Sequence, residues 1–234
     1  VTEINPQEGY DKTTTFTEYA AKLEIQRKLA DDDQHRIMAR LPKELAVSAN
    51  RTKEKLGAGV FDLGFTYTPT DGDAVSLYNT AHPSRVSGVA TQSNRGTAAL
   101  SATNVETARI NMHDFRDDQN EKISPQGDTL LIPRALELTG WEIVNSKGKV
   151  DTANNNANFH QGKYKLVVWD RLTDTTDWFF NDYDRQKDYL VWYNRVPAQF
   201  HQDKDSSTMM AIYLGYYRVG TSWEDWRWSF GNIV

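Results

Sequence analysis

The sequence predicts a mixed α+β fold, and three observations support this prediction. A long helix-like segment runs from Asp31 to Phe65, with apolar side chains at roughly helical spacing. The stretch before it, residues 12–29, alternates its side chains as a strand does. From residue 163 onward the chain is rich in strand-like segments. The order of arm, helix, mixed middle and late strands indicates an α+β domain with an insertion.

Composition excludes several classes of protein. The chain has 234 residues and seven Trp, and its mean hydropathy is -0.69. Its net charge of -5 argues against a dedicated nucleic-acid-binding surface, and the lack of cysteine excludes disulfides and Cys-ligated metals. No apolar run approaches the length of a membrane span, and no signal peptide opens the chain. Because position 1 is Val rather than Met, we expect a processed chain or part of a longer one.

The stretch at residues 12–29 is expected to form an extended arm. It follows a polar loop tip at residues 1–11 and keeps its period of two over most of its length. Few large apolar groups lie on either face, so such a strand is poorly buried by its own domain. We therefore expect it to lie against something else, such as another copy of the protein. The side chains expected at this inter-subunit contact are Phe16, Tyr19, Leu23 and Ile25.

The segment Asp31–Phe65 is predicted to be an amphipathic helix that covers a sheet. The aspartates Asp31–Asp33 offer N-cap oxygens and favourable charge at its start. Pro42 interrupts the pattern, which predicts either a kink or a restart with this proline in the first turn. Gly57 and Gly59 weaken the end of the helix, and Gly64 is a natural stop.

The middle of the chain alternates turns with short elements. Asp71-Gly72-Asp73 is predicted to be a tight turn, because the later ligands of a calcium loop are missing. Residues 76–84 are expected to form a short strand and residues 84–100 a surface loop. Thr103 and Glu106 have the spacing of a capping box at the start of a second helix. The apolar stripe of that helix is Val105, Ala108, Met112 and Phe115.

The second half begins with a buried strand at residues 129–133. A third helix is predicted to start at Pro133, and an asparagine-rich loop to occupy residues 150–162. The apolar residues of that helix are Leu136, Leu138, Trp141 and Val144. The later strand candidates are residues 163–171, 177–182, 188–196 and 208–220, followed by 223–231.

Motifs for catalysis or metal binding are missing from the sequence. No nucleophile elbow, thiol nucleophile, P-loop or dinucleotide loop is present. The histidines do not share a metal-ligand spacing: His35, His82, His113, His160 and His201. A glycosidase pair would need two of the many aspartates, whose usual role is to solvate loops and cap helices: Asp114, Asp117, Asp118, Asp170, Asp174, Asp177, Asp182 and Asp184. The sequence therefore predicts no catalytic residues, no cofactor and no metal.

One aromatic row leaves a second interpretation open. Trp223, Trp226, Trp228 and Phe230 fall in one short stretch, and the last three share one face of a strand. Exposed, such a row would stack on sugar rings or bases, the former as in a carbohydrate-binding or glycoside-cleaving β-rich module. The favoured interpretation is a core or a subunit interface, where Trp and Tyr contribute most of the burial.

Five segments in colinear order resemble the major capsid protein of tailed bacteriophages, and most closely its Mu-like major head subunit branch. The resemblance covers roughly residues 10–220, and each motif is weak when taken alone. The segments are RIMARLPKELAVSANRTKEKLGAGVFDLGF (36–65), LYNTAHPS (77–84), ALSATNVETARINMHDFRDD (99–118), TLLIPRALELTGWEIVNS (129–146) and RLTDTTDWFFND (171–182).

The resemblance implies a Hong Kong 97-type viral capsid fold with a long spine helix. Residues 1–30 would be the returning strand of the extended loop, which reaches a neighbouring subunit. Residues 31–84 and 187–234 would form the peripheral domain, and residues 85–186 the axial domain. The family's N-terminal arm and outgoing strand have no counterpart here, and its Lys–Asn cross-linking motif is not matched.

The resemblance also implies a structural role rather than an enzymatic one. Such a protein self-assembles into hexamers and pentamers of an icosahedral shell that encloses double-stranded DNA without sequence-specific binding. Its other partners would be decoration, portal and scaffold proteins, and neither cofactor nor membrane is implied. The protein would be part of the virion and would assemble in the host cytoplasm. An accessory phage protein on the same fold, such as a decoration or scaffold-like relative, is the further alternative.

Overall fold

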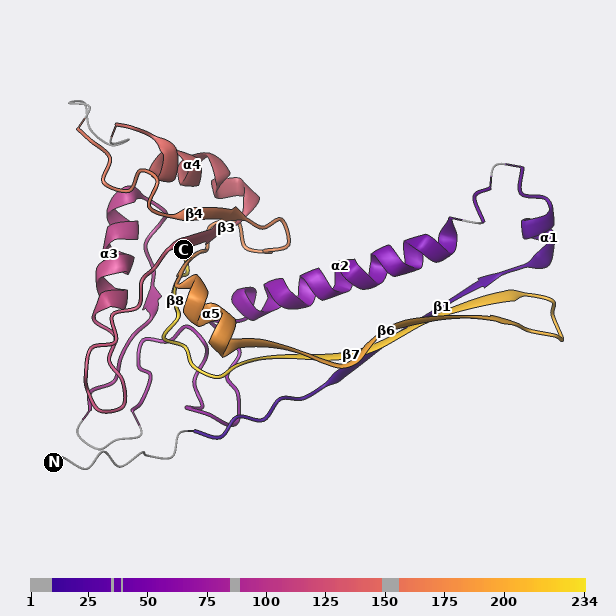
Figure 1. The fold of residues 1–234 in the computed structure, drawn as a ribbon, viewed down its shortest axis with the longest axis horizontal. Helices are drawn as coiled ribbons and strands as arrows, with labels where there is room; N and C mark the ends of the chain where they lie inside the picture. The colour runs from indigo at the N-terminus through magenta and orange to yellow at the C-terminus, as the bar shows by residue number, and fades with distance from the viewer. Residues whose placement is uncertain (1–9, 35, 39, 85–88, 149–155) are drawn as a thin grey trace. The chain divides into compact units, whose positions relative to one another are not determined.

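The computed structural model describes residues 10–34, 36–38, 40–84, 89–148 and 156–234. The chain divides into unit 1, residues 1–13, 58–191 and 223–234, and unit 2, residues 14–57 and 192–222. In chain order, and with the labels of Figure 1, the elements are β1 (Thr17–Ile25), α1 (Arg27–Asp31), α2 (Leu41–Asp62), β2 (Arg95–Gly96), α3 (Ala102–His113), β3 (Thr129–Ile132), the 3₁₀ turn η1 (Arg134–Leu136), α4 (Glu137–Asn145), β4 (Lys165–Val168), β5 (Trp178–Asn181), α5 (Tyr183–Tyr189), β6 (Leu190–Lys204), β7 (Ala211–Trp223) and β8 (Ser229–Asn232).

Unit 1 is built on a mixed five-stranded sheet with the order β2-β8-β5-β3-β4. The central strand β5 is antiparallel to β8 and β3, whereas β4 runs parallel to β3. Neighbouring residues of a strand point to opposite faces. Phe179 of β5 meets Phe61 and Phe65 at ring-centroid distances of 5.2 and 5.9 Å, whereas Phe180 meets Tyr164 at 5.0 Å. The sheet therefore buries apolar side chains on both faces.

Two helices of unit 1 flank this sheet (Figure 1). The predicted apolar stripe is buried: Val105, Ala108 and Met112 of α3 are at most 1% exposed, and Phe115, which lies beyond the end of α3, is 3% exposed. Helix α4 approaches the sheet closely at Gly140, where a Cβ atom would lie only 2.5 Å from Ile132 Cδ1. The missing side chain thus permits the contact between α4 and β3.

Unit 2 contains a three-stranded sheet in the order β1-β7-β6. Strand β1 pairs antiparallel with β7, from Thr17 opposite Val219 to Ile25 opposite Ala211. The turn between β6 and β7 is closed by the Asp205 N–H, which donates to the Met210 carbonyl at 3.0 Å. The two outer strands β1 and β6 are the edges of this sheet.

The first part of α2 lies on the three-stranded sheet of unit 2. Leu45 Cδ2 is 3.7 Å from the position that a Cβ atom would take on Gly215. Thr52 is hydrogen-bonded to the Tyr217 hydroxyl, and Lys53 Nζ lies 5.3 Å from the centroid of the same ring. The prediction that this helix covers the late strands is confirmed within unit 2.

The predicted helix Asp31–Phe65 is wrong in its N-terminal part, because α2 begins only at Leu41. The Asp33 carboxylate accepts hydrogen bonds from the backbone N–H groups of Ile37 at 3.0 Å and Met38 at 2.8 Å. Such local side-chain bonds compete with helical ones, so the aspartate favours a turn here.

The other landmarks of this helix follow the prediction in part. Pro42 lies in the first turn of α2, so the restart occurs rather than a kink. Gly57 and Gly59 lie inside the helix and do not end it; α2 ends at Asp62, before Gly64. A helical glycine costs about 1 kcal/mol relative to alanine, which the burial of aromatic side chains such as Phe61 offsets.

The predicted arm at residues 12–29 contains a shorter strand, followed by helix α1. The sequence predicts that this strand lies against something outside its own domain. That prediction is wrong for the backbone pairing, because β1 pairs with β7 of the same unit. Strand β7 spans 13 residues and so has room to pair all nine residues of β1. Residues 1–9 of the predicted loop tip lie outside the described part of the chain.

The predicted strand at residues 76–84 is also wrong. Within the described part of this segment, only His82 forms a bridge, with Gln92. Side chains hold the backbone instead: Asn79 Oδ1 accepts the Ala81 N–H at 2.9 Å. Asparagine side chains form such local turns readily, which explains why the alternating pattern did not produce a strand.

The second helix starts two residues earlier than the capping-box spacing predicts. Ser101 is the N-cap, and its Oγ accepts the Asn104 N–H at 3.2 Å. Glu106 pairs with Arg109 rather than closing a capping box with Thr103. Serine is a preferred N-cap residue, so Ser101 indicates the start of this helix better than Thr103 does.

The predicted strand at residues 129–133 is confirmed as β3, and each late candidate contains or adjoins a strand of the structure, β4 to β8. The asparagine-rich loop lies partly outside the described residues, which resume at residue 156. Among the described helices, none is both long and apolar enough to span a membrane.

Candidate functional site

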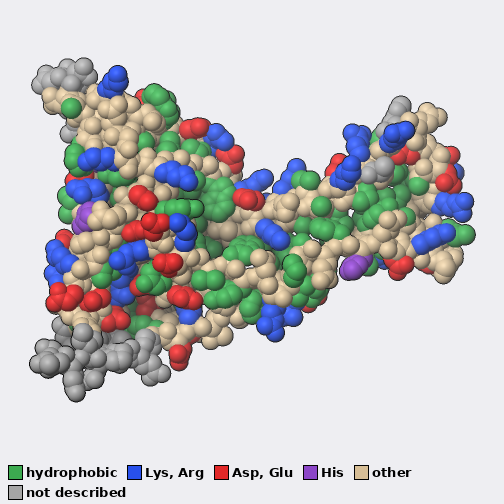
Figure 2. All heavy atoms as spheres, viewed as in Figure 1, with side chains coloured by type: hydrophobic (Ala, Val, Ile, Leu, Met, Phe, Trp, Pro, Cys, Tyr) green, Lys and Arg blue, Asp and Glu red, His purple; other side chains and the backbone are tan. Residues whose placement is uncertain are grey.

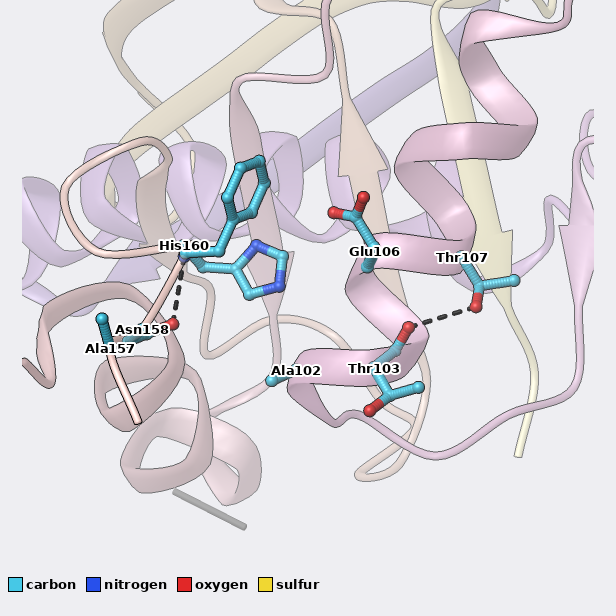
Figure 3. A pocket seen from close by; sticks show the side chains of 8 residues that line it. Ala102, Thr103, Glu106, Thr107, Ala157, Asn158 and His160 are labelled. Carbon is cyan, nitrogen blue, oxygen red and sulfur yellow. Dashed lines mark hydrogen bonds between the residues drawn. The ribbon is translucent and has the colours of Figure 1, made fainter. Parts of the chain in front are cut away.

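A hollow of about 420 Å³ opens in unit 1 between α3 and the segment that returns from α4 (Figure 3). The first turns of α3 form one wall of the hollow, and the N-cap Ser101 fixes where this helix begins. Asn158 fixes the other wall: its Nδ2 donates to the carbonyls of Ile143 at 2.8 Å and Ser146 at 2.9 Å. The lining residues are Ala102, Thr103, Glu106, Thr107, Ala157, Asn158, Phe159 and His160.

The acidic side chain of the hollow is neutralised by a neighbour on its own helix. Arg109 donates from Nε to Glu106 Oε2 at 2.9 Å and from Nη2 to Oε1 at 2.6 Å. These hydrogen bonds lower the pKa of Glu106 below its ordinary value and raise that of Arg109. Glu106 is therefore an ionised partner of Arg109 at neutral pH rather than a proton donor.

The histidine of the hollow is also held by neighbours. His160 is 5% exposed, and its Nδ1 lies 3.1 Å from the Tyr164 hydroxyl. Burial lowers the pKa of this histidine and raises that of Tyr164. The ring is accordingly neutral at physiological pH. Figure 3 shows His160 and Glu106 on opposite walls of the hollow, with no further ionisable residue among those labelled.

The outer face of α4, in the same unit, carries two uncovered apolar side chains. Leu138 is 70% exposed and Trp141 is 55% exposed. Of the other apolar residues that the sequence places on this helix, Val144 is buried and Leu136, which lies in η1, is partly buried. The sequence carried a signal for this: apolar residues in two directions on one short helix indicate a second contact face.

The aromatic row at the C-terminal end lies inside unit 1. Trp223 is 9% exposed, Trp226 7%, Trp228 0% and Phe230 4%. Trp226 stacks on the ring of His82 at a centroid distance of 4.1 Å. The interpretation as an exposed platform for sugar rings is therefore wrong, and the interpretation as core is confirmed. These aromatics belong to the same buried cluster as the aliphatic side chains of β3 and α4.

The four residues predicted at an inter-subunit contact, Phe16, Tyr19, Leu23 and Ile25, lie within or next to β1 in unit 2. Tyr19 stacks on Tyr217 at a centroid distance of 5.1 Å, and Phe16 meets Tyr193 edge-on at 6.2 Å. Ile25 is 5% exposed, and Phe16, Tyr19 and Leu23 are half-buried. Their contact with another copy stays a prediction.

The aspartates considered for a glycosidase pair serve turns, caps and ion pairs, as the favoured interpretation predicts. Asp182 caps α5 by accepting the Arg185 N–H at 3.1 Å, and Asp174 accepts the Thr176 N–H at 2.7 Å. The others are held by cations or by backbone N–H groups: Asp114, Asp117, Asp118, Asp170, Asp177 and Asp184.

The histidines do not assemble a metal site in the described part of the chain, where no cluster of three or more His, Asp or Glu side chains could hold an ion. His82 lies 2.6 Å from Asp73 Oδ2 through Nδ1 and 3.0 Å from Asn94 Oδ1 through Nε2. It is thereby a fixed part of the core. His35 lies outside the described residues.

Comparison with models of protein families shows to which family the chain belongs. The family model described as phage capsid protein matches residues 9–230, which is nearly the whole sequence. The chain belongs to this phage capsid protein family. The role of a phage capsid protein is structural. No sequence among the curated proteins matches the chain.

Solved capsid structures share the fold of this family member. A protein of Mycobacterium phage Patience is 11% identical, and the match covers 100% of this chain and 75% of that one with a TM-score of 0.64. The bacteriophage PhiM1 mature capsid gives 13% identity, 100% and 78% coverage and a TM-score of 0.61. The capsid of a native GTA particle gives 13% identity, 94% and 74% coverage and a TM-score of 0.55.

Proposed function

We propose that the chain is the major head subunit of a tailed bacteriophage and belongs to the Mu-like branch with the Hong Kong 97-type fold. The observation that carries this proposal is the alignment of the entire chain with a protein of a mature phage capsid, at a TM-score of 0.61. The family match over residues 9–230 supports it. The subunit is not an enzyme under this proposal, and its chemistry consists of contacts with other copies.

The proposed shell is icosahedral and is built from hexamers and pentamers of this chain around double-stranded DNA. The net charge of -5 suits a container that does not bind its genome tightly. Assembly takes place in the host cytoplasm, and decoration, portal and scaffold proteins are the proposed further partners.

Each part of the chain receives a role in this proposal. Residues 1–30 form the extended-loop arm, with Phe16, Tyr19, Leu23 and Ile25 at a contact with a second copy. Residues 31–84 and 187–234 form the peripheral domain, in which α2 is the spine helix. Residues 85–186 form the axial domain.

Expression of the full chain followed by negative-stain electron microscopy tests the proposal. We expect closed shells of uniform diameter, because closed symmetry is the usual outcome for self-associating chains. A chain that stays monomeric at every concentration and salt condition, with or without the proteins encoded beside it, would contradict the proposal.

The arm contact has a separate test with a matched control. Leu23→Ala is expected to reduce shell formation while the fold is retained, since this half-buried residue lies on the edge strand β1. Val47→Ala, which truncates an exposed side chain of the same unit on α2, is the control. Equal shell yields for the two variants would contradict the arm contact but leave the capsid role intact.

A further inference from the structure

The outer face of α4 is a contact surface that unit 1 itself does not use. Its inner face is already committed, because Gly140, Ile143 and Val144 are buried. Leu138 and Trp141 point away from this core with exposed fractions of 70% and 55%. Figure 2 shows hydrophobic side chains at the surface where Figure 1 places α4. Adjacent large apolar side chains on a surface mark an interaction site.

An ion-pair network of three side chains lies at the start of α4. Arg134 binds Asp170 through two hydrogen bonds, of 2.7 Å from Nε and 3.0 Å from Nη2. Its Nη1 also donates to Glu137 Oε2 at 2.8 Å. The arginine is thus neutralised by two carboxylates, and Glu142, next to Trp141, forms no ion pair among the described residues. The face is therefore apolar with an acidic rim.

The hollow beside α3 has the opposite character. Its apolar lining includes Ala102, Ala157 and the 54% exposed Phe159. Lys163 Nζ lies 3.0 Å from the Phe159 ring centroid, and Arg109 Cζ lies 5.6 Å from it. Glu106 neutralises Arg109, whereas Lys163 is exposed and forms no ion pair in the described part of the chain. The hollow is thus apolar with a basic rim.

Size and charge together make these two surfaces complementary. The volume of about 420 Å³ falls within the range of about 300–1,000 Å³ that holds compact molecules in protein pockets, so an indole has room to enter. A cation beside an aromatic ring also attracts a second ring that offers its face. The apolar face of α4 carries a carboxylate without an ion-pair partner among the described residues, and it matches a hollow whose Lys163 ammonium group lies over Phe159 and likewise has no ion pair there.

We propose that the outer face of α4 in one copy docks into the hollow beside α3 of a second copy, with Trp141 in the hollow and Glu142 beside Lys163. We assign the partner at the hollow to a second copy of this chain because the two surfaces are complementary in charge. The inference rests on the proposed function, since it names a contact by which the shell subunits would associate.

Charge reversal tests the contact and separates it from a purely structural role. Glu142→Lys and Lys163→Glu are each expected to lower the shell yield about tenfold or more, because each reversal places two like charges opposite one another at the contact. The double variant restores the original pairing with reversed signs and is expected to recover most of the yield. Glu121→Lys, a reversal at an exposed position of unit 1 away from both surfaces, is the control and is expected to assemble normally.

Truncation of Trp141 tests the apolar packing at the proposed contact. Trp141→Ala is expected to abolish shells and to leave the melting temperature of the subunit unchanged, because the indole is exposed in the single chain. Leu63→Ala, which removes an exposed leucine elsewhere in unit 1, is the control. Normal assembly of Trp141→Ala would overturn the inference.

Cross-linking between chains shows directly whether the two surfaces meet. The protein has no cysteine, so Asn145→Cys on the outer face of α4 and Ala157→Cys at the hollow introduce single thiols. Each variant carries a different tag, and a short bismaleimide is added after co-assembly. We expect a product that carries both tags. Products joined only between identical variants would overturn the inference.

The unaltered chain distinguishes failure of this inference from failure of the proposed function. Shells formed by the unaltered chain together with no rescue in the double charge variant contradict only the α4 contact. The absence of shells from the unaltered chain contradicts the proposed capsid role itself, and with it the contact that rests on this role.

Discussion

The two sheets of this protein are stabilised in different ways. In unit 1, every residue of β3, β5 and β8 is buried, and aromatic rings fill the core. In unit 2, β1 is largely exposed and the second half of β6 is almost entirely exposed. Unit 1 therefore derives its stability from a large core of its own, whereas unit 2 relies on strand pairing and on a few aromatic rings, of which Tyr217 is buried.

The largest expected effect follows from removing a ring of the unit 1 core. Trp228 is fully buried, and its indole N–H has no hydrogen-bond partner among the described residues, so its contribution is packing. Trp228→Ala is expected to cost about 3–5 kcal/mol of unfolding free energy. Urea denaturation measures this loss, and hydrogen exchange should locate it in β5 and β8. Trp192→Ala, at a half-exposed position of unit 2, is the matched control.

A smaller effect is expected for the ring on which unit 2 depends. Tyr217 is 6% exposed, stacks on Tyr19 and is hydrogen-bonded to Thr52. Tyr217→Ala is expected to cost about 3 kcal/mol, the low end for a buried aromatic side chain. Exchange protection should fall in β1 and β7 and stay unchanged in unit 1. Tyr217→Phe keeps the packing, loses one hydrogen bond of about 1 kcal/mol, and serves as the control.

Faster hydrogen exchange across both sheets in Tyr217→Ala would contradict the difference between the two units, because it would mean that they unfold together. A loss of unfolding free energy in Tyr217→Ala as large as that in Trp228→Ala would also contradict this difference. Either result would show that unit 2 has a core comparable to that of unit 1.

The smallest effect concerns the ion pair beside the hollow. Because the pKa of Glu106 is lower in the folded than in the unfolded chain, its stabilisation is present above the unfolded pKa and is lost as the pH falls through the folded pKa. Glu106→Gln is expected to lose less than about 1 kcal/mol at neutral pH, since a partly exposed pair is screened by solvent. The difference from the unaltered chain should vanish in acid. Melting temperatures over a pH series measure it, and a difference that grows in acid would contradict the assignment.

Much of the local structure could be predicted from the sequence. The apolar stripe Val105, Ala108 and Met112 and the strand at residues 129–133 depend on side-chain periodicity, which the sequence displays directly. The start of α2 could not be predicted in this way, because Asp33 bonds to the backbone of a turn instead of capping a helix. A cap and a turn draw on the same residue types, and only the folded chain selects one of them.

The candidate site was less predictable than the fold. The sequence placed Leu138, Trp141 and Val144 on one helix without assigning their faces, and the close contact at Gly140 leaves Leu138 and Trp141 exposed. The hollow beside α3 joins residues more than fifty positions apart in the chain, from Ala102 to His160. No periodic pattern encodes such a juxtaposition.

The sequence by itself determined the mixed fold class, the elements with regular periodicity and the resemblance to phage capsid proteins, which the family match over residues 9–230 confirms. It did so because periodicity and motif order are properties of neighbouring residues. Only the tertiary structure decided that β1 pairs with β7, that the Trp223–Phe230 row is core and that α4 keeps an apolar face free. Those outcomes depend on which distant segments compete for the same buried space, and that competition is resolved only when the chain is folded.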